Sequence, residues 1–533
     1  MKSENKLAIA LVPGVRNLTV RSCCNIAATR SAIRTLGLFV LGCALAIVWD
    51  GAPGTAGAEE VPAFAPGMVN HMRQMRRFED VDKGTQPTPS LIPRFSAAPD
   101  RTGRVATFQP NGATFTFNNA FFKNLGTNGR TCFTCHQPQS GWSVSAADIA
   151  KRFEASAGTD PIFRLVDGAT CPNVGVSTMA AKQRAYELLT SKGLIRIGLP
   201  IPTGAEFAVT AVNDPYQCNT NPVTGLTSPT SGIVSIYRRP LPATNLGFLS
   251  AIMWDGREPS LSNQATDATL GHAQADTPPT AAQIAEIVAF ESGLFTAQAF
   301  DQKAKDLSDD GSTGGPIALS LQLTNSFFFI GVNDPLGQNP TGAPFTSQIF
   351  DLYRPWLGLY SKDPVAAQRR SIERGEELFN NTTFNIKGVS GLNDDLNVAS
   401  IPGFCGTCHD TPQVGDHSVK APLDIGVGDA GANKPPVLDI SGLPVFTLTC
   451  TQGALAGRIY MVTDPGRALI SGKCKDIGRL KGPILRGLAS RAPYFHNGSA
   501  ATLLDVLNFY DQRFGIGFTD QQKTDLVNFL NAL

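Results

Sequence analysis

The chain has 533 residues, which is too long for a single hydrophobic core and indicates several domains. Its formal net charge is +1, so the charge balance gives no reason to expect a nucleic acid partner. Hydrophobic residues make up 42% of the sequence and charged residues 17%, a balance typical of a soluble globular protein.

The N-terminal segment has the pattern of an export signal. Arg30 and Arg34 precede an apolar run over residues 36–49, and the small residues 56–58 follow as a cleavage site. This run is short for a bilayer span, so we predict a signal peptide over residues 1–58 and no stable membrane span; a retained anchor is the alternative. Export predicts a periplasmic protein.

An irregular N-terminal arm is predicted for residues 59–110, because prolines interrupt it repeatedly. The first motif that indicates a specific chemistry is Cys132-Phe133-Thr134-Cys135-His136. It reads C-x-x-C-H, the attachment signature of a c-type haem, and the same pattern recurs as Cys405-Gly406-Thr407-Cys408-His409. Two thiols on one turn add to the two vinyl groups of a porphyrin, and the histidine supplies the proximal imidazole. A zinc or dithiol site is the alternative.

Residues 158–245 form an insertion that a minimal haem domain does not need. A helix is predicted over 178–192, with Ser177 as its N-cap and Gly193 as its stop. Short β-like runs follow at 195–197, 207–212 and 233–237.

The remaining elements are indicated by caps and apolar faces. A helix is predicted over residues 146–153, another begins at the Thr280/Gln283 capping box, and a last one begins at Thr519. We expect residues 308–345 to be a linker or loop region. A helix around 374–379 is expected to open the second haem domain, with the terminal helix packed across it.

Four of the eleven cysteines carry haem in this interpretation, and three lie in the leader. Cys171, Cys218, Cys450 and Cys474 remain, an even number in an oxidising compartment. The pairing of neighbours in sequence is Cys171–Cys218 and Cys450–Cys474. Two other pairings and free buried thiols stay open.

Taken together, these motifs resemble bacterial di-haem cytochrome c peroxidases, whose superfamily includes MauG-like enzymes and di-haem rubber oxygenases. The resemblance is carried by the two haem motifs, by residues 254–261, which begin Trp-Asp-Gly-Arg, by residues 482–489, and by residues 491–498. It covers the chain well from about 365 onward, in patches from 110 to 300, and not in the insertion.

The resemblance implies two unequal haems. The N-terminal one, ligated by His136, is implied to react with peroxide or dioxygen, and the C-terminal one, ligated by His409, to be six-coordinate and pass electrons. Trp254 is implied to couple the two, with core packing as the alternative. In the family, a catalytic glutamate lies some twenty residues beyond this tryptophan. Here the position is Gln274, which cannot titrate, so His272 is the alternative proton carrier.

The second haem also departs from the family. Neither the methionine nor the tyrosine that relatives use as sixth ligand occurs in residues 476–481. We predict His496 in this role, with His417 and Met461 as alternatives. Family members also hold calcium partly through a T-x-P turn, which Thr463-Asp464-Pro465 matches, so calcium at Thr463 and Pro465 is a further expectation.

The prediction is therefore a mainly α-helical protein of two cytochrome c-like domains, residues 111–355 with a loop- and β-containing insertion and residues 356–533. Its predicted function is reduction of hydrogen peroxide, with electrons from a small cytochrome c or cupredoxin. The alternatives are a di-haem oxygenase or MauG-like oxidase of an organic or protein substrate, and an electron carrier without catalysis. Two covalent haems c are the expected cofactors.

Overall fold

The computed structural model describes residues 88–220, 232–325, 329–337 and 339–533. The predicted signal peptide, and the part of the predicted arm before residue 88, lie outside these residues. Residues Pro66–Leu533 form one compact unit by their internal contacts, and all described residues belong to it. The described helices include none with the length and apolar character needed to cross a membrane.

The first half is built around short helices that follow the first haem motif. These are α2 (Ala146–Ser156), α3 (Met179–Ala185), α4 (Glu187–Lys192), α5 (Leu261–Gly271) and α6 (Ala281–Ser292). The predicted helix over 178–192 is interrupted at Tyr186, and its N-cap is Thr178 rather than Ser177, whereas Gly193 ends it in the left-handed conformation as expected. The Thr280/Gln283 capping box is confirmed at the start of α6.

Part of the predicted irregular arm is a sheet. Strands β2 (Phe95–Pro99), β3 (Gly103–Phe108), β8 (Phe295–Asp301) and β9 (Lys305–Asp306) form an antiparallel sheet in the order β2-β3-β8-β9. Strand β8 supplies the partner of β3 from almost two hundred residues further along the chain. Local pattern could not reveal this pairing, because the strand that completes the sheet is so distant in sequence. A smaller antiparallel pair is formed by β1 (Leu91–Ile92), which precedes β2 in the sequence, and β4 (Thr114–Phe115), which follows β3.

The insertion joins the two halves of the chain. The three predicted β-like runs are confirmed as β5 (Ile195–Pro200), β6 (Phe207–Asn213) and β7 (Ile233–Arg238). Strand β5 pairs with β7, whereas β6 pairs with β12 (Val445–Cys450), which also pairs with β13 (Ile459–Val462). The sequence-local disulfides are also confirmed: Cys171–Cys218 lies in the insertion, and Cys450–Cys474 ties β12 to the following loops.

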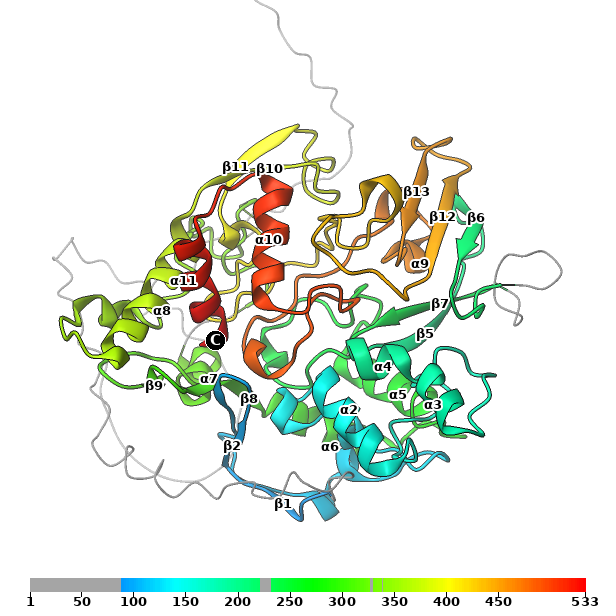
Figure 1. Cartoon of the computed structure of the whole chain (residues 1–533), viewed down its shortest axis with the longest axis horizontal. Helices are drawn as coiled ribbons and strands as arrows, with labels where there is room; N and C mark the ends of the chain where they lie inside the picture. Colours follow the sequence, from blue (N-terminus) through cyan, green and yellow to red (C-terminus); the bar gives the residue numbers. More distant parts are fainter. Residues whose placement is uncertain (1–87, 221–231, 326–328, 338) are drawn as a thin grey trace, which may run out of the picture. The chain divides into compact units, whose positions relative to one another are not determined.

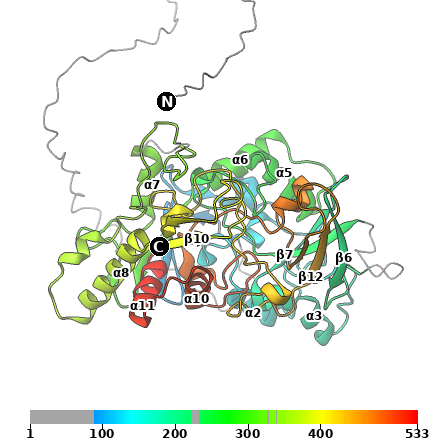
Figure 2. The same ribbon diagram turned by 90° about the horizontal axis from the view of Figure 1, so that it is seen from above.

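The second half packs its first and last helices together. They are α8 (Pro364–Asn381) and α11 (Asp520–Asn531), which lie side by side with α10 (Leu503–Phe514) next to them (Figures 1 and 2). A Cβ atom on Gly375 would lie 2.1 Å from the carbonyl oxygen of Asp525, so only glycine permits this approach. The predicted packing of the terminal helix across the opening helix is therefore confirmed.

The elements not yet named are a helix, a strand pair and a single helical turn. The predicted loop region over 308–345 contains α7 (Pro316–Asn325), so that prediction was wrong in part. Strands β10 (Phe384–Lys387) and β11 (Ser400–Gly403) form a hairpin near the second haem motif, and α9 (Ala468–Ser471) is a single turn.

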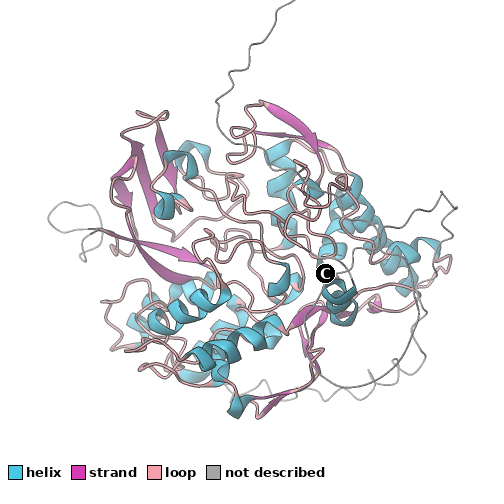
Figure 3. Ribbon diagram, turned by 180° about the vertical axis from the view of Figure 1, so that it is seen from behind, coloured by secondary structure: helices cyan, strands magenta, loops and turns pink. Residues whose placement is uncertain are grey.

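The mainly α-helical fold class was wrong. Helices account for 31% and strands for 17% of the structure, and the strands form five small sheets. Figure 3 shows the strands as short separate ribbons among the helices rather than as one central sheet. The prediction extrapolated from the haem motifs, and the segments before, between and after them contain the additional strands.

Candidate functional site: two haem-type cavities

The first haem motif lies at the wall of a cavity of about 160 Å³, the first cavity. Cys132–Thr134 form a 3₁₀ turn in which Thr131 and Thr134 cap one another, and this places Cys132 and Cys135 on one side of the turn. Both cysteines are free thiols that line the cavity. Two reduced thiols one turn apart, facing a mostly apolar space, fit a covalently attached porphyrin.

The ring of His136 is held in one orientation. Its Nδ1 lies 2.8 Å from the carbonyl oxygen of Trp142, to which it donates. Trp142 is fully buried, with its indole Nε1 donating to the hydroxyl of Thr107 at 2.8 Å. Burial lowers the pKa of His136, which favours the neutral imidazole. Because the proton sits on Nδ1, the lone pair of Nε2 is left for a metal.

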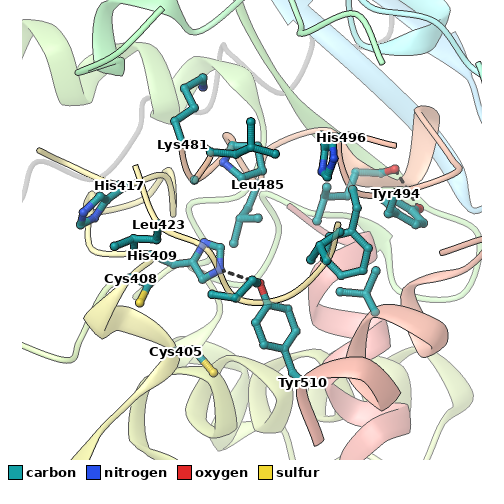
Figure 4. Close-up of a pocket in the computed structure, with 18 of the residues that line it drawn as sticks. Cys405, Cys408, His409, His417, Leu423, Lys481, Leu485, Tyr494, His496 and Tyr510 are labelled. Carbon is teal, nitrogen blue, oxygen red and sulfur yellow. Dashed lines mark hydrogen bonds between the residues drawn. The ribbon is translucent and has the colours of Figure 1, made fainter. Parts of the chain in front are cut away.

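The second motif repeats this geometry at a second cavity of about 220 Å³ (Figure 4). Cys405 and Cys408 are free thiols on the wall, and Nδ1 of His409 donates to the carbonyl oxygen of Gly415 at 2.7 Å. The hydroxyl of Tyr510 lies 3.5 Å from His409 Nε2, at the limit of a hydrogen bond. In both motifs the carbonyl that orients the histidine comes six residues later in the chain.

His496, the predicted sixth ligand, lines the second cavity (Figure 4). Its Nε2 is buried and has no hydrogen-bond partner; the nearest carboxylate oxygen, on Asp464, is 3.8 Å away. Burial lowers the pKa of His496 to about 4, so the imidazole is neutral at pH 7. A neutral imidazole with an unbonded ring nitrogen, on the wall of a haem-type cavity, fits an iron ligand.

The two alternatives are placed differently. His417 also lines the second cavity, but its Nδ1 contacts Asp410 at 3.1 Å. Met461 lies on β13, is 42% exposed, and is not on the wall of either cavity.

Trp254 lies between the two cavities and lines both. Its indole Nε1 donates to the carbonyl oxygen of Arg239 at 2.8 Å, and its own carbonyl accepts from the backbone N–H of Lys481 at 2.8 Å. The Trp254 ring also meets the His496 ring edge to face, with centroids 6.1 Å apart. The predicted bridging residue is thus fixed by backbone bonds on both sides.

The two polar residues predicted for the first cavity separate in the structure. His272 lines the cavity, and its Nδ1 lies 2.5 Å from Asp167 Oδ2. Asp167 also pairs with Arg130; although burial raises its pKa, the bonds to His272 and Arg130 lower it overall, so it is an anion. Gln274 is not part of the wall, and its amide oxygen accepts from Asn128 at 3.2 Å.

One residue of the first cavity was missed by the sequence analysis. Glu291, on the last turn of α6, lines the cavity and is 5% exposed, and its Oε2 has no hydrogen-bond partner. A glutamate on the otherwise apolar face marked by Ile287, one turn earlier, was the available signal.

Calcium at Thr463 and Pro465 stays a prediction. The hydroxyl and the N–H of Thr463 both donate to the carbonyl oxygen of Gly428, and the carboxylate of Asp464 is held by Arg238 at 2.6 and 2.9 Å. The described part of the chain contains no group of three or more His, Cys, Asp or Glu arranged to hold a metal. The carboxylate of this turn is thus already paired with a guanidinium, whereas the family holds calcium partly through backbone carbonyls.

Three curated relatives match parts of this chain. The cytochrome-c peroxidase IdrP2 of Denitromonas iodatirespirans is 32% identical over 154 residues, 27% of this chain and 40% of that protein. The cytochrome-c peroxidases IdrP1 of the same organism and of Pseudomonas sp. (strain SCT) are 40% identical over 70 residues and 29% identical over 143 residues. These two alignments cover 11% and 24% of this chain, and 19% and 36% of the relatives.

The predicted resemblance to di-haem cytochrome c peroxidases is confirmed by these relatives, and it implies haem as the cofactor. The chain spans less than half the length of each relative that it matches. No family model matches the chain.

A solved structure also aligns with the chain. It is the crystal structure of a MauG-like protein associated with microbial copper homeostasis, which covers 78% of this chain and 87% of its own, with a TM-score of 0.34 and 15% identity. An alignment at this level supports no conclusion about fold or function by itself.

Proposed function

We propose that the chain is a periplasmic di-haem c-type oxidoreductase that reduces hydrogen peroxide with electrons from a small donor protein, a cytochrome c or a cupredoxin. The observation that carries this proposal is the pair of cavities, each with a C-x-x-C-H turn on its wall, that share Trp254. The names of the curated relatives support the same activity.

The residues that would hold the cofactors follow from the geometry. Cys132, Cys135 and His136 would hold the first haem, and Cys405, Cys408 and His409 the second, with His496 as its sixth ligand. When bound, haem supplies an iron that exchanges single electrons and binds small oxygen ligands. The resemblance assigns peroxide to the first cavity, whose second histidine, His272, is held by Asp167 through Nδ1.

Residues of the chain would orient the cofactors and transfer protons. The carbonyls of Trp142 and Gly415 orient the two proximal rings, and Trp254 gives an aromatic contact between the cavities. The imidazole of His272, held by anionic Asp167 through Nδ1, keeps Nε2 available to accept a proton.

The test is the stoichiometry of donor oxidation. Purified holoprotein would be mixed with reduced cytochrome c and a limiting amount of hydrogen peroxide, and donor oxidation followed optically. We expect two donors oxidised per peroxide, because reduction to two waters takes two electrons. Protein shown by mass spectrometry to carry two haems, but giving no peroxide-dependent oxidation with cytochrome c or a cupredoxin, would contradict the proposal.

A second candidate is oxidation of an organic substrate at the first cavity. One wall of that cavity is apolar, built from Leu241, Pro242, Ala243, Leu246 and Leu249. Such a wall suits an apolar molecule as well as a small oxidant. Incorporation of labelled oxygen from ¹⁸O₂ into an organic product would favour this candidate over peroxide reduction.

A further inference from the structure

Glu291 is placed where a carboxylate is least stable. It lies in the last turn of α6 (Ala281–Ser292), where the helix dipole gives a negative potential, and no basic residue occurs in that turn. Its side chain is directed to the first cavity from the same face as Ile287. A negative charge here would be buried, with Oε2 unpaired.

The surroundings of Glu291 confirm this electrostatic isolation. No salt bridge to Glu291 is found among the described residues, and its Oε2 is buried without a partner. Burial alone raises its pKa to about 8, and no cation opposes the effect. Glu291 and Cys132, one of the two thiols of the motif, line the same cavity.

The other acid of this cavity, Asp167, has partners that stabilise its negative charge. Asp167 is buried too, but it contacts Arg130 and His272, which keep it an anion. The cavity therefore has two acids in opposite states. The ionisable side chains on its wall are Lys123, Arg130, Cys132, Cys135, His136, Asp167, Arg238, Arg239, Arg257, His272 and Glu291. Of the two carboxylic acids, Glu291 is the one that holds a proton at neutral pH.

We propose that Glu291 is a catalytic proton donor of the first cavity, taking the place that Gln274 cannot fill. This inference rests on the proposed peroxide reduction. In that reaction the O–O bond breaks, and two electrons and two protons give two waters. The donor protein supplies the electrons, the Glu291 carboxyl supplies one proton and is reprotonated from solvent, and the second proton comes from solvent at His272, whose side chain is 38% exposed.

The test compares two matched variants of the haem-loaded protein. Glu291→Gln keeps the size and removes the proton, and Glu286→Gln makes the same change on α6 at a carboxylate that accepts from the N–H of Ala120, which glutamine can also do. We expect the rate of peroxide reduction to fall roughly 100-fold in Glu291→Gln and to stay unchanged in Glu286→Gln. Glu291→Asp should recover part of the rate. In the wild type, the rate should fall as the pH rises through about 8, because the protonated form is the active one.

An infrared spectrum gives a readout that does not depend on turnover. We expect a protonated-carboxyl stretch at pH 7 in the difference spectrum of wild type minus Glu291→Gln, and none in that of wild type minus Glu286→Gln. The subtraction removes the band of Glu376, a buried acid outside this cavity whose pKa is also raised to about 8. No such band, or a full rate in Glu291→Gln, would overturn the inference. If the loaded wild type does not reduce peroxide, the proposed function fails instead. The infrared band then decides for Glu291: a shift on adding cyanide would support a carboxyl that faces a ligand in the cavity, and no shift would overturn it.

Discussion

At the scale of single residues, the two cavities differ in what faces the proximal histidine. The rings of His136 and His409 are oriented in the same way, each by a carbonyl six residues later. The second cavity then adds His496, neutral and unbonded at Nε2, whereas the first adds His272, bonded at Nδ1, and Glu291. His272 and Glu291 suit proton transfer to a small ligand in the first cavity. His496 suits ligation of a metal in the second cavity.

The ligation of the second haem gives the residue-scale prediction. In His496→Ala, we expect the oxidised holoprotein to lose one low-spin haem signal and gain a high-spin one, because the sixth ligand is gone. His417→Ala removes the other histidine of the same cavity and serves as the control, with an unchanged spectrum expected. The reverse result, a change with His417→Ala and none with His496→Ala, would assign the ligand to His417.

Features set by short-range chemistry could be predicted from the sequence. The haem turns and the capping boxes at Thr280 and Thr519 depend on residues close in the chain. The two disulfides join cysteines that are neighbours in the order of the remaining cysteines, which the count of cysteines could indicate. Glu291 was missed although it follows Ile287 by one turn on an apolar helix face, because its burial without a partner is a property of the folded chain. The calcium turn was a three-residue match, and the structure shows Arg238 in contact with its aspartate.

At the scale of elements, the insertion is part of the framework between the two halves rather than an appendage. Strand β6 pairs with β12, so a strand of the insertion completes a sheet of the second half. The mainly helical prediction failed here for a physical reason. A strand is stabilised by its partner, and the partner of β6 lies more than two hundred residues later.

The disulfides give the element-scale prediction. Cys171–Cys218 closes a separation of 47 residues and Cys450–Cys474 one of 24. Loop-closure entropy assigns roughly 4 kcal/mol to the first and roughly 3.5 kcal/mol to the second. Replacing each pair by serine should therefore lower the urea midpoint of unfolding in both cases, slightly more for Cys171/Cys218. An unchanged midpoint for both variants would contradict a stabilising role.

At the scale of the whole molecule, a buried ion cluster ties the two haem-bearing halves together. Arg238, at the end of β7, contacts Asp255 beside Trp254 at 2.5 Å and Asp464 of the second half at 2.6 Å, and all three side chains are at most 2% exposed. Burial raises the pKa of both aspartates, but the charge of Arg238 lowers it overall, so both are anions. Trp254 precedes Asp255 in the sequence, and Nε2 of His496 lies 3.8 Å from Asp464 Oδ2.

Removal of that guanidinium gives the whole-molecule prediction. Arg238→Gln leaves two buried carboxylates without their main partner, so we expect a loss of about 3–5 kcal/mol in the free energy of unfolding at pH 7. In the wild type, the lowered aspartate pKa values stabilise the fold above about pH 4, and this contribution is lost as the pH falls through their folded values. In Arg238→Gln this acid-dependent loss should shrink. The exposed Arg458→Gln makes the same charge change and should leave both quantities unaltered.

The inequality of the two sites is the central claim, and an electron paramagnetic resonance spectrum of the resting oxidised holoprotein tests it most directly. The arrangement predicts one high-spin haem, at the cavity of His136, and one low-spin haem, at the cavity of His409 and His496, in equal amounts. Two low-spin signals, or two high-spin signals, would contradict it.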